Sequence, residues 1–117
     1  MKAKGATEHQ IQKAWFQWWN MTYGSPLAWA IPNGGARHIV TATKLRAEGV
    51  RAGVPDVFIA KPRHPWHGLF LEFKTEKGRV SDSQEFMLQI LEDQGYKTAV
   101  VRSVDEAIKV TNTYFGR

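Results

Sequence analysis

Residues 54–74 read VPDVFIAKPRHPWHGLFLEFK. Two apolar runs predict short β-strands, and the prolines and glycine between them predict a turn, so the expected strands are 57–60 and 69–74. Side chains two residues apart in a strand share a face, so Glu72 and Lys74 point into the same space. Asp56 stands at the start of the first strand. If the two strands pair as a hairpin, the carboxylates of Asp56 and Glu72 converge.

Two converging carboxylates repel each other unless a positive group lies between them. The oxygen ligands of Asp56 and Glu72 suit Mg²⁺ or Mn²⁺, which leave coordination positions open for water and phosphate. Such an ion polarises a phosphate, and Lys74 can orient the attacking water or offset charge in the transition state. The alternatives are a surface ion pair between Glu72 and Lys74, and a turn residue at Asp56. The combination of all three residues favours cleavage of a phosphodiester.

Three helices are expected to flank these strands along the chain. The first begins at a capping box of Thr7 and Gln10, and its apolar face comprises Ile11, Ala14, Trp15, Trp18 and Trp19. The second begins at a capping box of Ser81 and Gln84, and its expected buried stripe is Phe86, Met87, Ile90 and Leu91. The last begins at Ser103 and Glu106, and its expected inner face is Ala107, Ile108 and Val110.

The rest of the chain supplies two further strands and a loop-rich segment. Strands are expected at 27–31 and 97–102, and a short helix at 43–48. The glycine-rich segment 49–55 is expected to be a loop. The order of helix, strand, loop, strand, strand, helix, strand and helix predicts an α/β domain in which a mixed sheet is flanked by helices.

Size, charge and composition narrow the class of protein. The chain has 117 residues, 43% of them hydrophobic, which predicts one domain over residues 1–117. A net charge of +5 fits a polyanionic partner such as nucleic acid, although a merely basic soluble protein would look the same. The absence of cysteine excludes disulfides and thiolate metal sites. No apolar run approaches about 20 residues, so we expect an intracellular, cytoplasmic protein with no membrane partner.

The pattern Pro55-Asp56 followed by Glu72-Phe73-Lys74 resembles the PD-(D/E)xK nuclease superfamily. The surrounding sequence is closer still to the VRR-NUC family, which occurs as stand-alone phage proteins and as a nuclease domain of larger repair enzymes. The matching pieces reach from near residue 8 to about residue 102, and comprise Glu8, residues 32–35, 49–56 and 71–74, and Ser81 with Gln84. Gly-Val-Pro-Asp followed by Glu-x-Lys is the most specific of them.

The resemblance implies a restriction-endonuclease-like fold and Mg²⁺- or Mn²⁺-dependent cleavage of DNA. It implies that Asp56 and Glu72 hold the metal together with the main-chain carbonyl of Phe73, and that Lys74 is the catalytic lysine. Stand-alone members are similar to dimeric, structure-specific endonucleases. Branched DNA such as a four-way junction is therefore the expected substrate, and a homodimer the expected assembly.

Two further side chains are candidates for this site. Glu8 lies in the first turn of its helix, where an acidic residue also interacts favourably with the helix dipole. It stands on the inward edge, and the resemblance favours a metal ligand, acting directly or through water. Gln84 either completes the capping box with Ser81 or contacts the active site or a DNA phosphate, and the two roles are compatible at different times.

Basic residues on both sides of the expected catalytic strands are candidates for contacts to DNA phosphates. The segment before Asp56 carries Arg37, His38, Lys44, Arg46 and Arg51, and weaker candidates after the Glu72 strand are Lys77 and Arg79. Backbone N–H groups at 33–35 can approach the same phosphate. A solvated basic loop is the alternative interpretation of this segment.

Two alternatives keep the fold and change the function: a sequence-specific restriction-type endonuclease, and a non-catalytic DNA-binding module. A small-molecule nucleotide enzyme is unsupported, because the chain has neither a phosphate-loop lysine nor a dinucleotide fingerprint. The tryptophans of the first helix are expected to be mostly core. If they exceed what a small domain can bury, they mark a dimer interface, and the first candidates are Trp15, Trp18 and Trp19.

Overall fold

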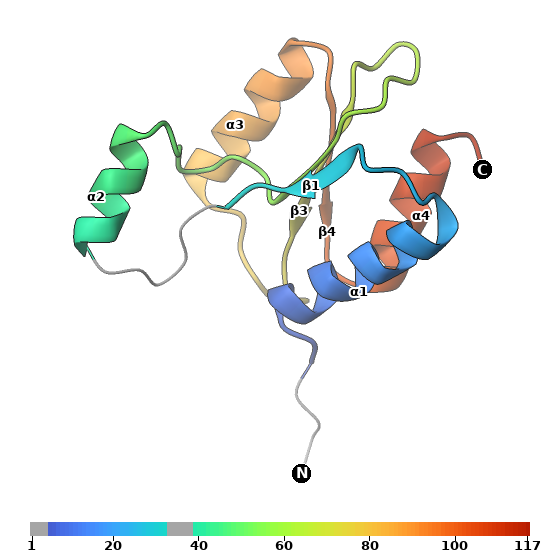
Figure 1. Ribbon diagram of the computed structural model, residues 1–117, viewed down its shortest axis with the longest axis horizontal. Helices are drawn as coiled ribbons and strands as arrows, with labels where there is room; N and C mark the ends of the chain where they lie inside the picture. Colours follow the sequence, from blue (N-terminus) through green and yellow to red (C-terminus); the bar gives the residue numbers. More distant parts are fainter. Residues whose placement is uncertain (1–4, 33–38) are drawn as a thin grey trace.

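The computed structural model describes residues 5–32 and 39–117. These form a four-stranded mixed sheet with helices on both faces (Figure 1). The strands lie in the order β1 (Ala28–Ala30), β2 (Val57–Ile59), β3 (Leu69–Phe73) and β4 (Lys97–Val101). The first three are antiparallel and β4 is parallel to β3. This confirms the expected α/β class, and each strand is one or two residues shorter than expected.

The helices begin where the sequence places their caps, with one exception. The capping boxes at Thr7 and Ser81 open α1 (Glu8–Thr22) and α3 (Asp82–Asp93), and Ser103 caps α4 (Val104–Tyr114). Helix α2 (Ile39–Ala47) begins four residues before the expected start at 43 and ends one residue before the expected end at 48. Its end follows from Gly49, which adopts the left-handed conformation that terminates helices. None of the described helices has the length and apolar character needed to cross a membrane.

One face of the sheet is covered by α1 and α4, and the core lies between them. Trp15 and Trp19 of α1 are fully buried in this core. Their indole N–H groups donate to Thr111 Oγ1 at 3.1 Å and to the Ser25 carbonyl at 2.9 Å. Trp18 packs half-buried against the same core. The expectation that these tryptophans are mostly core is confirmed, and the alternative of a dimer interface at Trp15 and Trp19 is wrong, because the sheet and α4 cover them within one chain.

The inner face of α4 is displaced from the one that the sequence predicts. Ala107 is buried as expected, whereas Ile108 and Val110 are only half-buried. The remaining buried positions are Thr111 and Tyr114, four and seven residues after Ala107. Thr111 is tolerated in the core because its hydroxyl both donates to the Ala107 carbonyl and accepts from Trp15.

The other face of the sheet carries an aromatic row and is only partly covered. Rings from four segments meet along it: Trp29, Phe58, Phe70 and Tyr96. Helix α3 packs against β4, which is an edge strand. Its expected buried stripe is wrong in part, because 66% of Phe86 and 37% of Ile90 are exposed while Met87 and Leu91 are half-buried. A helix that packs against a single edge strand buries only one side of its apolar stripe.

Candidate active site

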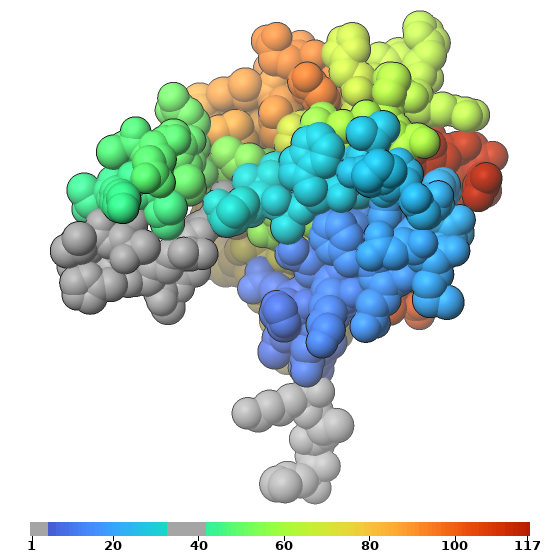
Figure 2. All heavy atoms as spheres, in the orientation of Figure 1, coloured from blue at the N-terminus to red at the C-terminus, as the bar shows by residue number. Residues whose placement is uncertain are grey.

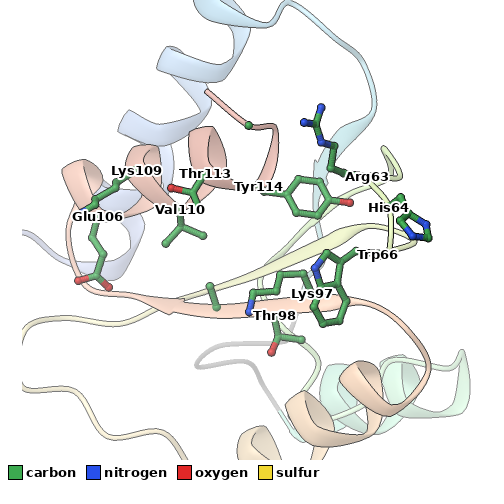
Figure 3. A pocket seen from close by; sticks show the side chains of 12 residues that line it. Arg63, His64, Trp66, Lys97, Thr98, Glu106, Lys109, Val110, Thr113 and Tyr114 are labelled. Carbon is green, nitrogen blue, oxygen red and sulfur yellow. The ribbon is translucent and has the colours of Figure 1, made fainter.

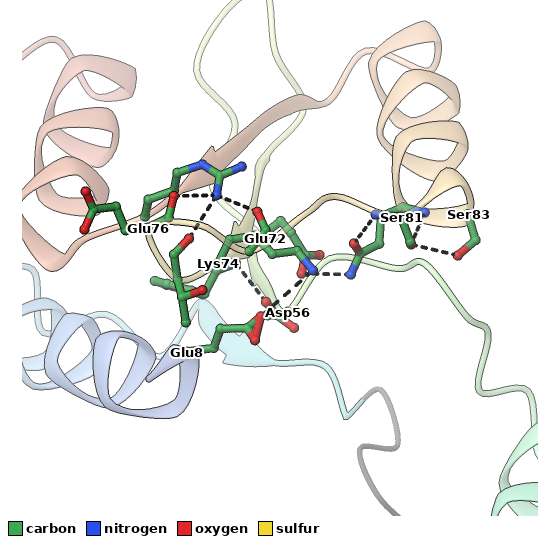
Figure 4. A network of polar contacts seen from close by, with 12 residues as sticks. Glu8, Asp56, Glu72, Lys74, Glu76, Ser81 and Ser83 are labelled. Atoms are coloured by element: carbon green, nitrogen blue, oxygen red, sulfur yellow. Dashed lines mark hydrogen bonds and ion pairs between the residues drawn. The ribbon is translucent and has the colours of Figure 1, made fainter. Parts of the chain in front are cut away.

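The hairpin of β2 and β3 brings the two acidic residues together (Figure 4). Val57 pairs with Leu71, so Asp56, one residue earlier, faces Glu72, one residue later. Asp56 Oδ2 also accepts the backbone N–H of Phe73 at 2.8 Å. The predicted convergence of Asp56 and Glu72 is thus confirmed, and the carboxylate of Asp56 is fixed on the neighbouring strand.

Glu72 is a buried acid: only 2% of its surface is exposed. With both carboxyl groups ionised, its Oε2 atom has no hydrogen-bond partner among the residues that the structure describes. Burial and then the charge of Asp56 raise the pKa of Glu72 to about 9, although Lys74 acts in the opposite direction. The alternative of a surface ion pair is excluded by this burial. Glu72 is instead a carboxyl group held in an environment that disfavours its ionised form.

Lys74 lies at the end of β3 and pairs with the first helix. Its Nζ is 3.9 Å from Glu8 Oε1, and 11% of the lysine side chain is exposed against 51% of the glutamate. The backbone N–H of Lys74 donates to the Val101 carbonyl at 2.9 Å, which extends the pairing with β4. Figure 4 shows Glu8 reaching from α1 toward Asp56. Within residues 5–32 and 39–117, however, no three His, Asp or Glu side chains form a ready metal cage.

Gln84 performs both of the roles that the sequence offers it. Its Oε1 accepts the backbone N–H of Ser81 at 2.9 Å, which completes the capping box. Its Nε2 donates to Glu72 Oε1 at 3.3 Å. The sequence suggested that Gln84 fills these two roles at different times. In the structure both hydrogen bonds are present together. The first turn of α3 is thereby tied to the buried acid.

The family follows from a comparison of the whole chain with known domains. A model of the VRR-NUC domain matches residues 6–105. The chain belongs to the VRR-NUC domain family. A solved structure described as a VRR_NUC domain protein is similar, with a TM-score of 0.84 and 28% identity over 97% of this chain and 92% of that one. No curated protein matches the chain. Because VRR-NUC domains are nuclease domains, membership implies a nuclease-type function on DNA.

A contact that sequence reasoning missed braces this VRR-NUC site from the loop before Asp56. Gly53 has a φ of +87° and passes so close to α3 that a Cβ there would collide with the Ser83 carbonyl. Glycine is therefore required for both its conformation and its size. The glycine-rich loop is visible in the sequence, but its packing partner is not. Gly53 holds the loop against the helix turn that carries Gln84.

Arg102 is a second missed residue, and it fixes the loop that follows Lys74. Its Nη1 donates to three backbone carbonyls, at 2.9 Å to Thr75, 3.3 Å to Glu76 and 2.6 Å to Gly78. The only sequence signal is an arginine at the end of an apolar strand, since backbone acceptors have no side-chain signature. Arg102 therefore positions the backbone of the loop at residues 75–78, which follows Lys74.

Arg102→Met is expected to lower the free energy of unfolding by about 2 kcal/mol, because it leaves three loop carbonyls without a charged donor. Chemical denaturation followed by circular dichroism measures this directly. Arg79→Met serves as the matched control, since Arg79 is exposed and lies just beyond the same loop. Equal denaturation midpoints for Arg102→Met and the parent would show that the loop does not depend on this guanidinium.

The predicted DNA-contacting cations are distributed over several surfaces. Lys44, Arg46 and Arg51 are exposed on α2 and the loop after it. Arg46 and Arg51 line a groove of about 420 Å³ together with Ser83, Phe86 and Met87 of α3. Figure 2 shows α2 (green) beside α3 (orange) on that side of the molecule.

The other predicted cations lie apart from this groove. Lys77 lines a different cavity, of about 600 Å³, between the loop after Lys74 and α1. Arg79 is exposed. Arg37 lies outside the described residues, as do His38 and the backbone at 33–35.

Proposed function

We propose that this chain is a Mg²⁺- or Mn²⁺-dependent endodeoxyribonuclease that selects branched DNA, such as a four-way junction, by the shape of its backbone. The observation that carries the proposal is the close pair of carboxyls formed by the half-buried Asp56 and the buried Glu72. One of the four oxygens already accepts the Phe73 N–H, and Glu72 Oε2 has no partner in the described part of the chain. Lys74 offsets part of this negative charge but does not prevent the pKa of Glu72 from rising, and a cation between the two carboxyls would favour their ionised forms.

A divalent ion fits the donors that are present. Hard carboxylate oxygens are the ligands that Mg²⁺ and Mn²⁺ prefer. Asp56 and Glu72 would hold the ion with the main-chain carbonyl of Phe73, and Glu8 would contribute directly or through water. When bound, such an ion supplies Lewis-acid activation of the scissile phosphate and of the attacking water.

The protein side chains supply the rest of the site. Lys74 is largely buried and is held by Glu8, so its positive charge is kept in a poorly solvated place where it can offset charge on the phosphate. Gln84 holds Glu72 through the 3.3 Å bond to Oε1 and leaves Oε2 free for a ligand. The carboxylates therefore act as ligands, Lys74 compensates charge, and Gln84 orients the buried acid.

Basic residues around the site would bind the DNA backbone without reading bases. The proposed contacts come from six side chains: Arg37, Lys44, Arg46, Arg51, Lys77 and Arg79. Such contacts give affinity that is independent of sequence and sensitive to salt. A homodimer would present two such sites to the two strands of a junction. Exposed apolar side chains remain available for that assembly, among them Met21, Leu27 and Trp29.

A cleavage panel tests the proposal with plasmid, linear duplex, flap and four-way junction DNA in Mg²⁺, Mn²⁺ or chelator. We expect cleavage only with a divalent ion, and a rate on the junction at least about 10-fold above that on linear duplex, equivalent to about 1.4 kcal/mol. Discrete sequence-defined cuts in plain duplex would instead identify a restriction-type endonuclease. If a Lys74→Ala variant nicks DNA as fast as the parent, the nicking does not depend on the proposed catalytic lysine. That result would favour the non-catalytic DNA-binding module.

A further inference from the structure

A cavity of about 620 Å³ lies away from the proposed active site (Figure 3). The turn between β2 and β3, the start of β4 and one side of α4 form its walls. Lys97, Thr98 and Ala99 of the wall pair with Leu69, Phe70 and Leu71, so the wall runs along β4 and ends one residue before the partner of Glu72. Neither Asp56, Glu72 nor Lys74 lines this cavity.

Two aromatic rings give the cavity a preformed apolar surface. Trp66 is half-buried, and its backbone N–H and carbonyl both bond to Arg63 across the turn, at 2.7 and 3.0 Å. Tyr114 is 8% exposed, and its hydroxyl donates to the Lys61 carbonyl at 2.7 Å. The hydroxyl bond fixes the Tyr114 ring, and the Trp66 ring packs against the core from a turn whose backbone is hydrogen-bonded. Flat, fixed rings of this kind are suited to stacking with a planar ligand.

Positive charge gathers around these rings from three separate elements. Arg63 comes from the turn, Lys97 from β4 and Lys109 from α4. Lys97 Nζ lies 5.3 Å from the centre of the Trp66 ring. In the described chain none of the three cations has a carboxylate within ion-pair distance. The acidic side chain of the lining is Glu106, which accepts the backbone N–H of Arg102 at 3.2 Å.

The edge of β4 is a poor site for an added peptide strand, although β4 ends the sheet. Its Thr98 directs its backbone N–H and its hydroxyl to Glu92 Oε1, at 3.4 and 3.0 Å. Because the Thr98 N–H is already hydrogen-bonded, it is not free to pair with a strand of another chain. The chemistry of the cavity therefore favours a compact ligand that combines a planar ring with negative charge.

We propose that this cavity binds a nucleoside phosphate, presented either as a free mononucleotide or as a nucleotide of single-stranded DNA. The base lies against Trp66 and Tyr114, and the phosphate meets Lys97 with Arg63 and Lys109 on either side. The volume falls within the roughly 300–1,000 Å³ of small-molecule sites. Stacking on aromatic side chains with cations on the phosphate is also how proteins hold single strands. Binding here goes beyond the nuclease function and does not depend on it.

Titration calorimetry in chelator tests this site without any cleavage. The probes are thymidine monophosphate, inorganic phosphate and a 5′-phosphorylated six-nucleotide oligothymidylate. We expect the monophosphate to bind with a Kd below about 1 mM. Arg63→Glu and Lys97→Gln should each weaken that binding at least about 10-fold. Lys13→Glu, which changes an exposed lysine of α1 outside the cavity, should leave it unchanged.

Binding of the oligonucleotide distinguishes the two possible ligands, a free mononucleotide and a nucleotide within single-stranded DNA. Tighter binding of the oligonucleotide than of the monophosphate, lost in both cavity variants, identifies a DNA strand as the ligand, whereas binding of the monophosphate alone identifies the free nucleotide. Inorganic phosphate that binds as tightly as the monophosphate would overturn the proposal, because the rings would then contribute nothing. So would cavity variants that bind like the parent while circular dichroism shows them folded.

Discussion

Asp56→Asn is expected to slow DNA cleavage at least about 1,000-fold, equivalent to about 4 kcal/mol of transition-state stabilisation. The substitution removes one negative charge from the proposed metal ligands and keeps the shape of the side chain. The amide oxygen can still accept the Phe73 N–H that Asp56 Oδ2 accepts at 2.8 Å, so the hairpin should be retained. Single-turnover nicking of a labelled junction measures the rate, and a gel-shift assay in chelator measures binding, which should be largely unchanged.

Asp105→Asn is the matched control, because it makes the same chemical change on an exposed residue in the first turn of α4. It should cleave at the parental rate. An Asp56→Asn protein that no longer folds would identify Asp56 as structural. A folded Asp56→Asn protein that still cleaves would remove Asp56 from the set of metal ligands.

Glu72→Gln is expected to stabilise the metal-free protein at pH 7 by about 3 kcal/mol. The pKa of Glu72 is about 9 in the folded chain against an ordinary value of 4.5, so between these values the folded state holds a proton that the unfolded state has lost. The free energy of unfolding of the parent therefore falls by up to about 1.4 kcal/mol per pH unit from about pH 4.5 to about pH 9. Glutamine carries no such proton and keeps an amide oxygen for the bond from Gln84.

Urea denaturation in chelator at three pH values tests this linkage. The stability difference between Glu72→Gln and the parent should be small near pH 4.5 and widen toward pH 9. Glu85→Gln, which alters an exposed acid of α3, should track the parent throughout. A difference that is constant over pH would mean that Glu72 is not held protonated by the fold.

The sequence by itself determined the elements and the identity of the acidic pair. Hydroxyl caps at Thr7, Ser81 and Ser103 fixed the starts of three helices, because capping depends on neighbouring residues only. The alternation in β3 placed Glu72 and Lys74 on one face, and the convergence of Asp56 with Glu72 was expected on condition that the two strands pair, which the structure shows. The family pattern then identified the domain, which the match over residues 6–105 confirmed.

Only the tertiary structure decided how deeply each side chain is buried and what it touches. Trp15 and Trp19 are core residues because α4 and the sheet close over them, while Phe86 stays exposed because α3 leans on an edge strand. The raised pKa of Glu72 likewise depends on tertiary structure, because it follows from burial and from the charge of Asp56 on the neighbouring segment. The bonds of Arg102 to loop carbonyls have no sequence signature at all. Periodicity and caps are encoded over a few neighbouring residues, whereas burial and long-range bonds depend on which elements meet in space.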